Sequence, residues 1–164
     1  MSEAFEQLQQ IDKEIALLEH TSALLQWDQE TGMPDMAIEE RSDQIALLQG
    51  LAHDRLTSAE TGELLEAARA EAGTDARTGA KAEGGGSDAG AGVAAGLPAK
   101  DEPGFFQQAF LRVFGRNYAR AVKIPRRLVT DMAQTTSRAQ AAWIKAREAD
   151  DFSVFQPHLE KIVE

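Results

Sequence analysis

The chain of 164 residues contains no cysteine. This absence excludes disulfide bonds and any thiolate zinc site, and it fits a reducing compartment. No apolar run approaches the ~18 residues that a membrane span needs, so no membrane partner is expected. The first ten residues, MSEAFEQLQQ, lack the basic region and apolar core of a signal peptide. We therefore expect a cytoplasmic protein.

Basic residues are scarce, with 17 Lys and Arg against 27 Asp and Glu and a net charge of −10. Phosphate binding needs clustered bases, so nucleic acid is not an expected partner. The deficit is uneven, because residues 1–72 carry 16 acids and 4 bases while residues 105–164 carry 6 acids and 10 bases. The acidic and the basic part are either two surfaces that meet or two separate solvated faces, and composition leaves both open.

Apolar residues between Ser2 and Trp27 recur at intervals of three and four, which predicts a helix with one apolar stripe. The stripe comprises Leu8, Ile11, Ile15, Leu18 and Leu25, with Ser22 in the remaining slot. Gly32 is expected to take the left-handed position after this helix, and Pro34 prevents its continuation.

A second helix is predicted to begin at Asp35 or just after it and to run to about His53, and with the first it forms an antiparallel hairpin. Its inward residues are expected to be Ile38, Ile45, Leu48 and Leu51 or Ala52. The sequence Thr57-Ser58-Ala59-Glu60 is typical of a capping box that starts a third helix, which would pass through Leu64, Leu65 and Ala68 and end near Gly73.

Residues 73–104 hold nine of the 13 glycines, many alanines and few large aliphatic side chains. Such a segment cannot bury enough apolar surface to offset its chain entropy, so it is predicted to be a flexible linker or loop. The run Gly84-Gly85-Gly86 is not a phosphate cradle, because no Lys-Ser/Thr pair follows and no strand precedes it.

Helical spacing resumes in residues 105–164. Phe106, Phe110, Phe114 and Tyr118 form an aromatic stripe that is interpreted as core, and Arg112, Arg116 and Arg120 form a basic stripe. Three interpretations of these arginines stay open: they bind an anion or RNA, they form a solvated face, or they pair with the acidic part of the chain. Gly115 indicates close packing, because glycine within a helix costs up to ~1 kcal/mol.

A further helix is predicted from Arg126 to Ala149, with Pro125 in its first turn. Its expected inward residues are Leu128, Val129, Met132, Ala139, Ala142 and Trp143. Asp150-Asp151 breaks it, and a last helix follows through Phe152, Phe155, Leu159 and Ile162, with Pro157 in its first turn. The fold class is therefore all-α: a helical hairpin plus amphipathic helices, interrupted by a Gly/Ala-rich loop. The apolar period still runs at Glu164, which suggests a shortened chain.

Candidate chemistry is sparse. His20, His53 and His158 have no second histidine at a zinc-binding spacing and no nucleophile motif beside them. Asp28 and Glu30 point to different sides of a helix, so they do not form a shared-proton pair. Because an acid near a helix C-terminus is unfavourable, we expect Asp28 to pair with Arg41 across the hairpin while Trp27 fills its apolar side. No catalytic, cofactor-binding or metal-binding residue is assigned.

Two sequence blocks together resemble the Taq-type carboxypeptidases, a family of all-helical zinc metallopeptidases. The first is LLQWDQETGMP (24–34), followed by Ala37, Glu40, Arg41, Gln44, Ala46, Leu48 and Leu51-Ala52-His53. The second begins at Lys123-Ile124-Pro125 with Leu128-Val129. It continues through Thr136-Ser137-Arg138-Ala139-Gln140 and Ala142-Trp143 to Asp151-Phe152-Ser153, Phe155 and Pro157-His158-Leu159-Glu160. The resemblance covers about 1–72 and 105–164.

The resemblance implies that the chain is the N-terminal part of an enzyme that removes C-terminal residues from peptides. Family members hold zinc with His-Glu-x-x-His and a downstream Glu, and no residue here corresponds to these. We therefore expect one partial domain with no cofactor of its own, whose partner is a C-terminal catalytic region. In family terms it forms helical wall beside the substrate channel. The alternative is a free-standing helical interaction module that self-associates through exposed apolar faces.

Overall fold

The structure is a computed structural model that describes residues 3–72 and 104–163. The helices are α1 (Glu3–Thr31), α2 (Ile38–Thr57), α3 (Ala59–Glu71), α4 (Phe105–Ala121), α5 (Arg126–Glu148) and α6 (Gln156–Val163), with 3-10 turns at Asp35–Ala37 and Phe152–Val154. The all-α fold class is confirmed. The linker predicted over 73–104 lies almost entirely outside the described residues, so it and the boundaries that it sets stay predictions. Within the described ranges, no helix has the length and apolar content to cross a bilayer.

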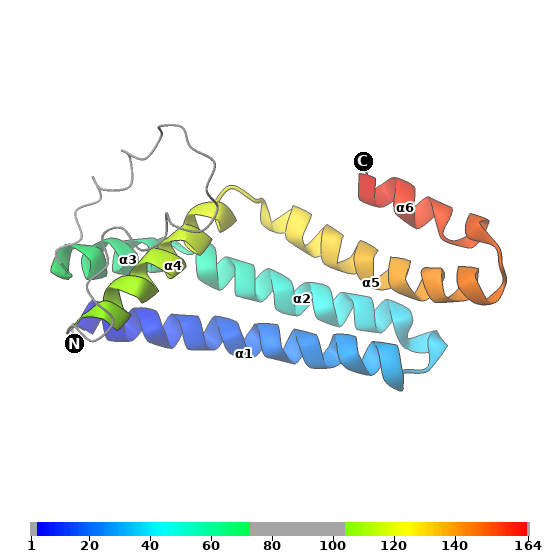
Figure 1. Ribbon diagram of the computed structural model, residues 1–164, viewed down its shortest axis with the longest axis horizontal. Coiled ribbons are helices and arrows are strands. Elements are labelled where there is room, and N and C mark those ends of the chain that lie inside the picture. The colour runs from blue at the N-terminus through cyan, green and yellow to red at the C-terminus, as the bar shows by residue number, and fades with distance from the viewer. Residues whose placement is uncertain (1–2, 73–103, 164) are drawn as a thin grey trace.

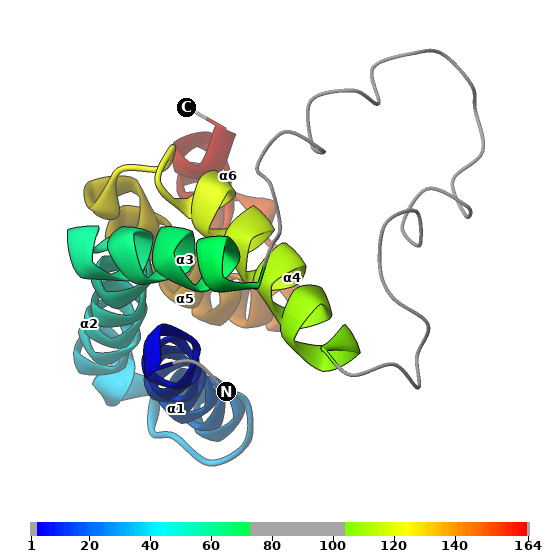
Figure 2. The same ribbon diagram turned by 90° about the vertical axis from the view of Figure 1, so that its left-hand side faces the viewer.

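The long helices α1, α2 and α5 lie side by side, and each runs opposite to the one before it (Figure 1). Helix α6 folds back along the end of α5. At the other end of the molecule, α3 and α4 pack against each other close to the start of α1 (Figure 2). The predicted hairpin residues thus form the first two layers, and α5 covers α2.

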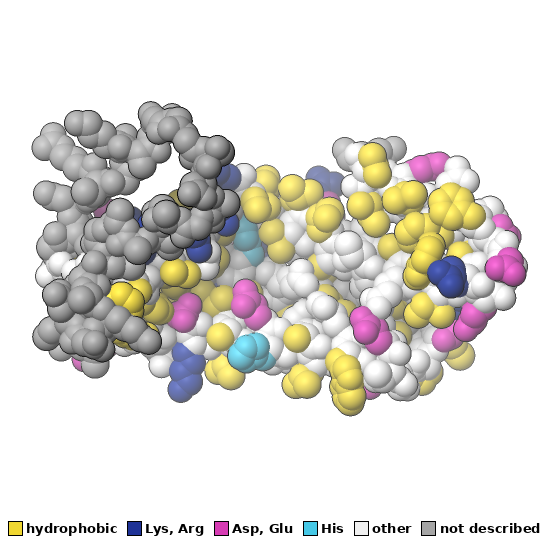
Figure 3. Space-filling view, in the orientation of Figure 1, with side chains coloured by type: hydrophobic (Ala, Val, Ile, Leu, Met, Phe, Trp, Pro, Cys, Tyr) yellow, Lys and Arg dark blue, Asp and Glu magenta, His cyan; other side chains and the backbone are white. Residues whose placement is uncertain are grey.

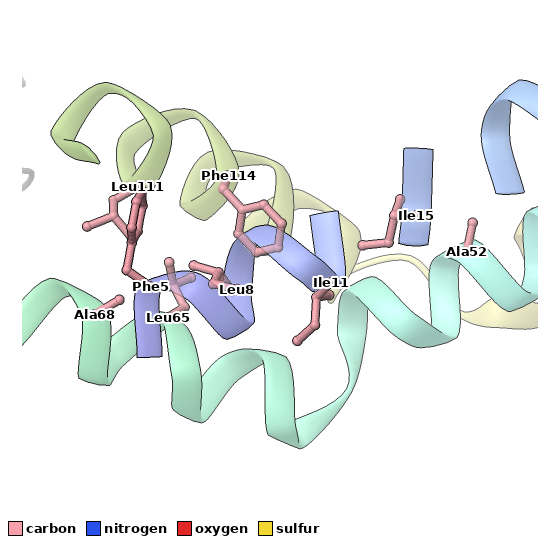
Figure 4. Close-up of a cluster of buried hydrophobic side chains, with 9 residues drawn as sticks. All are labelled: Phe5, Leu8, Ile11, Ile15, Ala52, Leu65, Ala68, Leu111 and Phe114. Carbon is pink, nitrogen blue, oxygen red and sulfur yellow. The ribbon is translucent and has the colours of Figure 1, made fainter. Parts of the chain in front are cut away.

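The largest buried cluster lies where α1, α3 and α4 meet (Figure 4). Its members are Phe5, Leu8, Ile11, Ile15, Ala52, Leu65, Ala68, Leu111 and Phe114. The predicted stripe of α1 is confirmed at Leu8, Ile11, Ile15 and Ser22, while Leu18 and Leu25 are half-buried. On α2, Ile45 and Ala52 are buried and Leu51 is 43% exposed, so Ala52 takes the inward position.

The turn between α1 and α2 differs from the prediction. Helix α1 continues one turn beyond Trp27, to Thr31. Among the described glycines only Gly104 has a positive φ, so Gly32 does not take the left-handed position. The amides of Gly32 and Met33 both donate to the Asp28 carbonyl at 3.0 Å, which closes the helix without a left-handed residue. Pro34 follows, and α2 then runs to Thr57 rather than to His53.

The cap of α3 is also displaced by one residue from the predicted box. Ser58 is the N-cap, and its hydroxyl accepts from the Thr61 amide at 3.1 Å. Glu60 instead forms an ion pair with Arg55 at 2.6 Å. The predicted pattern was correct in kind, because a Ser or Thr hydroxyl satisfies an otherwise unpaired amide at either position.

The aromatic stripe of α4 enters the core only in part. Phe114 is 4% exposed, Phe110 stacks on it and meets Phe5 edge to face, and Phe106 is 63% exposed. The core prediction is therefore wrong for Phe106, which lies at the start of α4. Gly115 packs against the Arg69 side chain of α3, which confirms the close approach predicted there. Arg112, Arg116 and Arg120 lie on the exposed side.

The buried side chains of α5 are smaller than those predicted to point inward. Ala139 and Ala142 are buried as expected, but Leu128, Met132 and Trp143 are 51%, 42% and 43% exposed. The buried residues are Ala133, Thr135, Ser137, Ala139, Ala142 and Ala146. Ala133 and Ser137 contact α2, where the two helices approach closely: a Cβ added at Gly50 would lie 3.0 Å from Thr130 Cγ2. Side-chain size misled the prediction.

The predicted break after α5 is confirmed. Asp150 has φ 51°, and the Asp151 amide donates to the Ala146 carbonyl at 2.9 Å, which closes the helix in a Schellman motif. The Asp151 carboxylate accepts from the Ser153 hydroxyl at 2.7 Å and from the Ser153 amide at 3.0 Å, and these two hydrogen bonds hold the pKa of Asp151 below its usual range. Pro157 lies in the first turn of α6, as predicted.

Ion pairs join the acidic part to the basic part. Asp54 pairs with Arg126 at 2.8 Å, Glu39 with Arg138 at 2.7 Å and Asp35 with Lys145 at 3.3 Å. In each pair the acid belongs to residues 3–72 and the base to α5. Of the two alternatives that composition left open, the two charged surfaces do meet along α5.

Candidate functional site: the corner of α1, α2 and α5

The two family-like blocks meet in space although about a hundred residues separate them. Residues 27–31 end α1, and residues 136–140 lie in the middle of α5. The Ser137 hydroxyl donates to Gln29 Oε1 at 2.7 Å, and Gln29 Nε2 donates back to the Ser137 carbonyl at 3.0 Å. Gln140 Nε2 donates to Glu30 Oε1 at 2.7 Å. We call this meeting point of α1, α2 and α5 the corner.

Helix α2 joins the corner through Ser42, which is fully buried. Its hydroxyl lies 3.0 Å from the Ser137 hydroxyl and donates to the Ile38 carbonyl at 2.7 Å. A buried polar group that loses its partner costs about 1–3 kcal/mol, so the Gln29–Ser137–Ser42 chain fixes how the three helices cross.

The predicted pair of Asp28 and Arg41 is confirmed. Arg41 Nη2 lies 2.7 Å from Asp28 Oδ2, and Nη1 donates to the Leu25 carbonyl at 2.7 Å. Arg41 therefore neutralises the acid near the end of α1 and adds a charged hydrogen bond to a carbonyl of the same helix. The accompanying prediction for Trp27 is wrong, because its side chain is 64% exposed.

The two acids of the corner have separate partners: Arg41 for Asp28 and Gln140 for Glu30. The two side chains point to different neighbours, as the sequence indicated. The Ser137 hydroxyl contacts an amide and another hydroxyl, neither of which serves as a general base at neutral pH. The corner is thus a polar clamp that joins the three helices.

Two hollows lie along the helices that form the corner. A small cavity of about 100 Å³ is lined by Gln29, Met33, Asp35, Ile38, Gln140, Ala141, Ile144, Lys145 and Glu148. A wider trough of about 420 Å³ lies between α1 and α2 and is lined by Ile15, Glu19, Ser22, Ala23, Gln26, Gln49, Ala52, His53, Leu56 and Val129. The small cavity shares Gln29 and Gln140 with the corner.

The three histidines lie on α1, α2 and α6. Among residues 3–72 and 104–163, no three His, Cys, Asp or Glu side chains come together in a group that would hold a metal ion. The described donor set therefore does not fit the zinc that the family resemblance implies. The sequence-based assignment of no site residue in the whole chain stays a prediction.

The sequence reasoning missed Gln29 and Ser42 as members of the corner. A signal was present, because Ser22, Ser42 and Ser137 all occupy buried helix positions where an apolar residue is the ordinary choice. A serine in an apolar slot indicates a buried hydrogen bond, but its partner lies on another helix and the sequence does not name it.

The comparisons with known proteins extend over nearly the whole chain. The family model of the carboxypeptidase Taq (M32) metallopeptidases matches residues 7–164. The chain is 31% identical over 159 residues to thermostable carboxypeptidase 1 of Thermus thermophilus, and 30% identical over 144 residues to thermostable carboxypeptidase 1 of Pyrococcus furiosus. These alignments cover 97% and 88% of this chain but only 26% and 23% of the two relatives.

Matches to solved structures also cover nearly all of this chain but only about a quarter of the matched chain. The crystal structure of BsuCP matches with a TM-score of 0.76 at 20% identity, which shows the fold, and the apo-Mg structure of Pyrococcus furiosus carboxypeptidase matches with 0.60 at 26% identity. Each match covers 99% of this chain and 27% of the solved chain. The chain thus spans about a quarter of the length of its relatives, and it belongs to the carboxypeptidase Taq (M32) metallopeptidase family.

Proposed function

We propose that this chain is the N-terminal helical part of a zinc-dependent metallocarboxypeptidase and is inactive by itself. Its role is to form helical wall beside the channel of the peptide substrate. The corner supports this reading most directly, because the blocks that mark the family lock α1, α2 and α5 into one rigid frame. Such a frame suits a wall and supplies no nucleophile, general base or metal ligand set of its own.

The partner in this proposal is the catalytic region that makes up the remaining three quarters of the relatives. That region would carry His-Glu-x-x-His and the zinc, and with them the hydrolytic chemistry. Apolar side chains gather over α6 and the adjoining end of α5 (Figure 3). Their exposure supports the proposal that the catalytic region covers this face. Trp143, Phe152, Leu159 and Val163 are 43%, 55%, 39% and 77% exposed. An exposed apolar patch of this kind is typical of an interaction surface.

A joint metal and activity assay on the purified chain tests the proposal. We expect no stoichiometric zinc after dialysis and no release of C-terminal amino acids from peptides, with a full-length relative as the positive control. One tightly bound equivalent of zinc, or zinc-dependent release of C-terminal residues, would overturn it.

The alternative function is a free-standing helical interaction module derived from the family. The same exposed face of α5 and α6 favours it, since two copies would cover each other's apolar side chains. A stop codon directly after Glu164, together with a stable folded dimer, supports this alternative. A reading frame that continues into His-Glu-x-x-His supports the first proposal.

A further inference from the structure

We propose that the chain consists of two complementary segments that recognise each other without their covalent connection. The N-segment is residues 3–72 and the C-segment is residues 104–163, and residues 73–103 connect them. The interface between the segments then carries its own specificity, and the 1:1 complex survives cleavage of the connection. This inference concerns an interaction surface and is independent of the proposed function.

The apolar part of the interface is supplied unequally. The N-segment contributes Phe5, Leu8, Ile11, Ile15, Ala52, Leu65 and Ala68 to the main cluster, and the C-segment adds Leu111 and Phe114. Leu111 and Phe114 are 2% and 4% exposed, and Phe110 meets the Phe5 ring edge to face with centroids 5.4 Å apart. Helix α4 thus fills a gap in a core that the N-segment largely forms, which is how a partner helix docks.

Close steric contacts in the interface fix the position of α4 on α3. These two helices lie on either side of the connection in the sequence. The Tyr118 ring of α4 lies over Gly62 of α3, where an added Cβ would come within 2.5 Å of the phenol oxygen. In return, the Arg69 side chain of α3 lies over Gly115 of α4. Each helix therefore offers a glycine to a large side chain of the other.

The polar part fixes the register of α5. Ser137 bonds to Gln29 on one side and meets Ser42 on the other, so a shift of one residue along α5 would leave these buried groups unpaired. The ion pairs to Asp54, Glu39 and Asp35 follow α5 from Arg126 through Arg138 to Lys145. Charge complementarity of this kind accelerates association and selects the partner.

The experiment cuts the connection after the full chain has folded. A specific protease site replaces Gly84-Gly85-Gly86, and the purified chain is cleaved and examined by native mass spectrometry and size-exclusion chromatography. We expect both pieces to remain together as a 1:1 complex at micromolar concentration and physiological salt, with unchanged helical circular dichroism. Separate elution of the two pieces would overturn the proposal.

A pair of variants tests whether charge selects the partner. In the nicked complex, Arg138→Glu is expected to raise the Kd roughly tenfold or more, because it places an acid beside Glu39 and Asp43. The matched control is Arg127→Glu, whose side chain is 90% exposed and pairs within α5 with Asp131, so its effect stays within about twofold. Glu39→Arg should restore binding to Arg138→Glu.

Equal effects of Arg138→Glu and Arg127→Glu would overturn charge-selected recognition. If uncut Arg138→Glu fails to fold, Glu39→Lys tests the same ion pair from a side chain that is 70% exposed. The expected result is again a weaker nicked complex, and an unchanged Kd contradicts the proposal.

Discussion

At the scale of single residues, polar side chains decide how the helices end and cross. Ser58 caps α3, Arg41 joins α1 to α2, and Asp150 closes α5. Ser58 pairs an amide at the start of α3, Arg41 bonds to Asp28 and to the Leu25 carbonyl of α1, and Asp150 adopts the positive φ that ends α5. These residues therefore affect stability more than their size suggests, and two of them give direct predictions.

Replacing Arg41 with alanine should destabilise the chain by about 1–3 kcal/mol, because the Leu25 carbonyl and Asp28 lose a charged partner whose side chain is 14% exposed. Urea unfolding at neutral pH, read as a lower midpoint with an unchanged slope, measures this. The control is Arg127→Ala, which removes a surface pair within α5 and should change the free energy of unfolding by less than about 0.5 kcal/mol. Equal midpoints for wild type and Arg41→Ala would contradict the structural role of this ion pair.

Replacing Asp150 with glycine should stabilise the chain by about 0.5–1 kcal/mol, because Asp150 has φ 51° and glycine adopts this conformation freely. Thermal unfolding followed by circular dichroism measures the gain as a higher Tm. Asp150→Ala also removes the acid from the end of α5 but keeps a Cβ, so it separates charge from backbone strain. A gain from alanine as large as that from glycine would assign the effect to charge.

At the scale of helices, small residues set the distances and larger ones fill what remains. Glycine lies at the contacts of α2 with α5 and of α3 with α4, where a side chain from the neighbouring helix takes the space of a Cβ. Close approach of this kind is sensitive to single methyl groups, because packed interiors do not yield easily.

Replacing Gly62 with alanine should destabilise the chain by about 1–2 kcal/mol although alanine favours helices, because the new Cβ would lie 2.5 Å from Tyr118 Oη. In the Tyr118→Phe background that oxygen is absent, so the same substitution should cost less. A double-mutant cycle from chemical unfolding measures the coupling. Gly32→Ala is the control, since its nearest neighbour, Asp28 Oδ1, is 3.8 Å away. Additive effects of the two substitutions would contradict the contact.

Arg55 ties three helices together and predicts a pH dependence. It contacts Glu14 of α1 at 2.9 Å and Glu60 of α3 at 2.6 Å, and its hydrogen bond holds the pKa of Glu14 below the usual value. A lowered carboxyl pKa stabilises the fold above the ordinary pKa near 4.5, and this contribution is lost as the pH falls through the folded value.

Replacing Glu14 with glutamine should therefore lower the free energy of unfolding at pH 7 and leave it nearly equal to wild type in strong acid. Unfolding midpoints measured from neutral pH to below pH 4 would show the two curves converge. Glu63→Gln, an exposed acid of α3, is the control and should shift the curve less. Parallel curves for wild type and Glu14→Gln would show that this carboxylate does not titrate with folding.

At the scale of the whole molecule, the described residues leave a large apolar surface uncovered on α5 and α6. If the chain is studied without a covering region, we expect it to self-associate, and analytical ultracentrifugation should show a weight-average mass that rises with concentration. The double variant Leu159→Glu and Val163→Glu should reduce this association at least several-fold. Met36→Glu is the control, because Met36 is 96% exposed in the turn between α1 and α2. If the double variant and Met36→Glu lost self-association equally, the contact between copies would lie elsewhere than on α6.

The sequence by itself determined the helices, the apolar stripe of α1, the break at Asp150-Asp151 and the pair of Asp28 with Arg41. These depend on local periodicity, on turn chemistry, or on a short hairpin whose register follows from its turn. It also carried the two blocks that name the family, because the order of residues along a chain suffices to compare sequences.

Only the tertiary structure decided that these two blocks meet, that α5 buries alanines and serines while Leu128, Met132 and Trp143 remain exposed, and that the acidic and basic parts face each other. Burial depends on which helix lies opposite and at what distance, and the partner residues are far away in sequence. Hydrophobicity ranks side chains by their preference for the interior, but the space between two backbones decides which of them fits there.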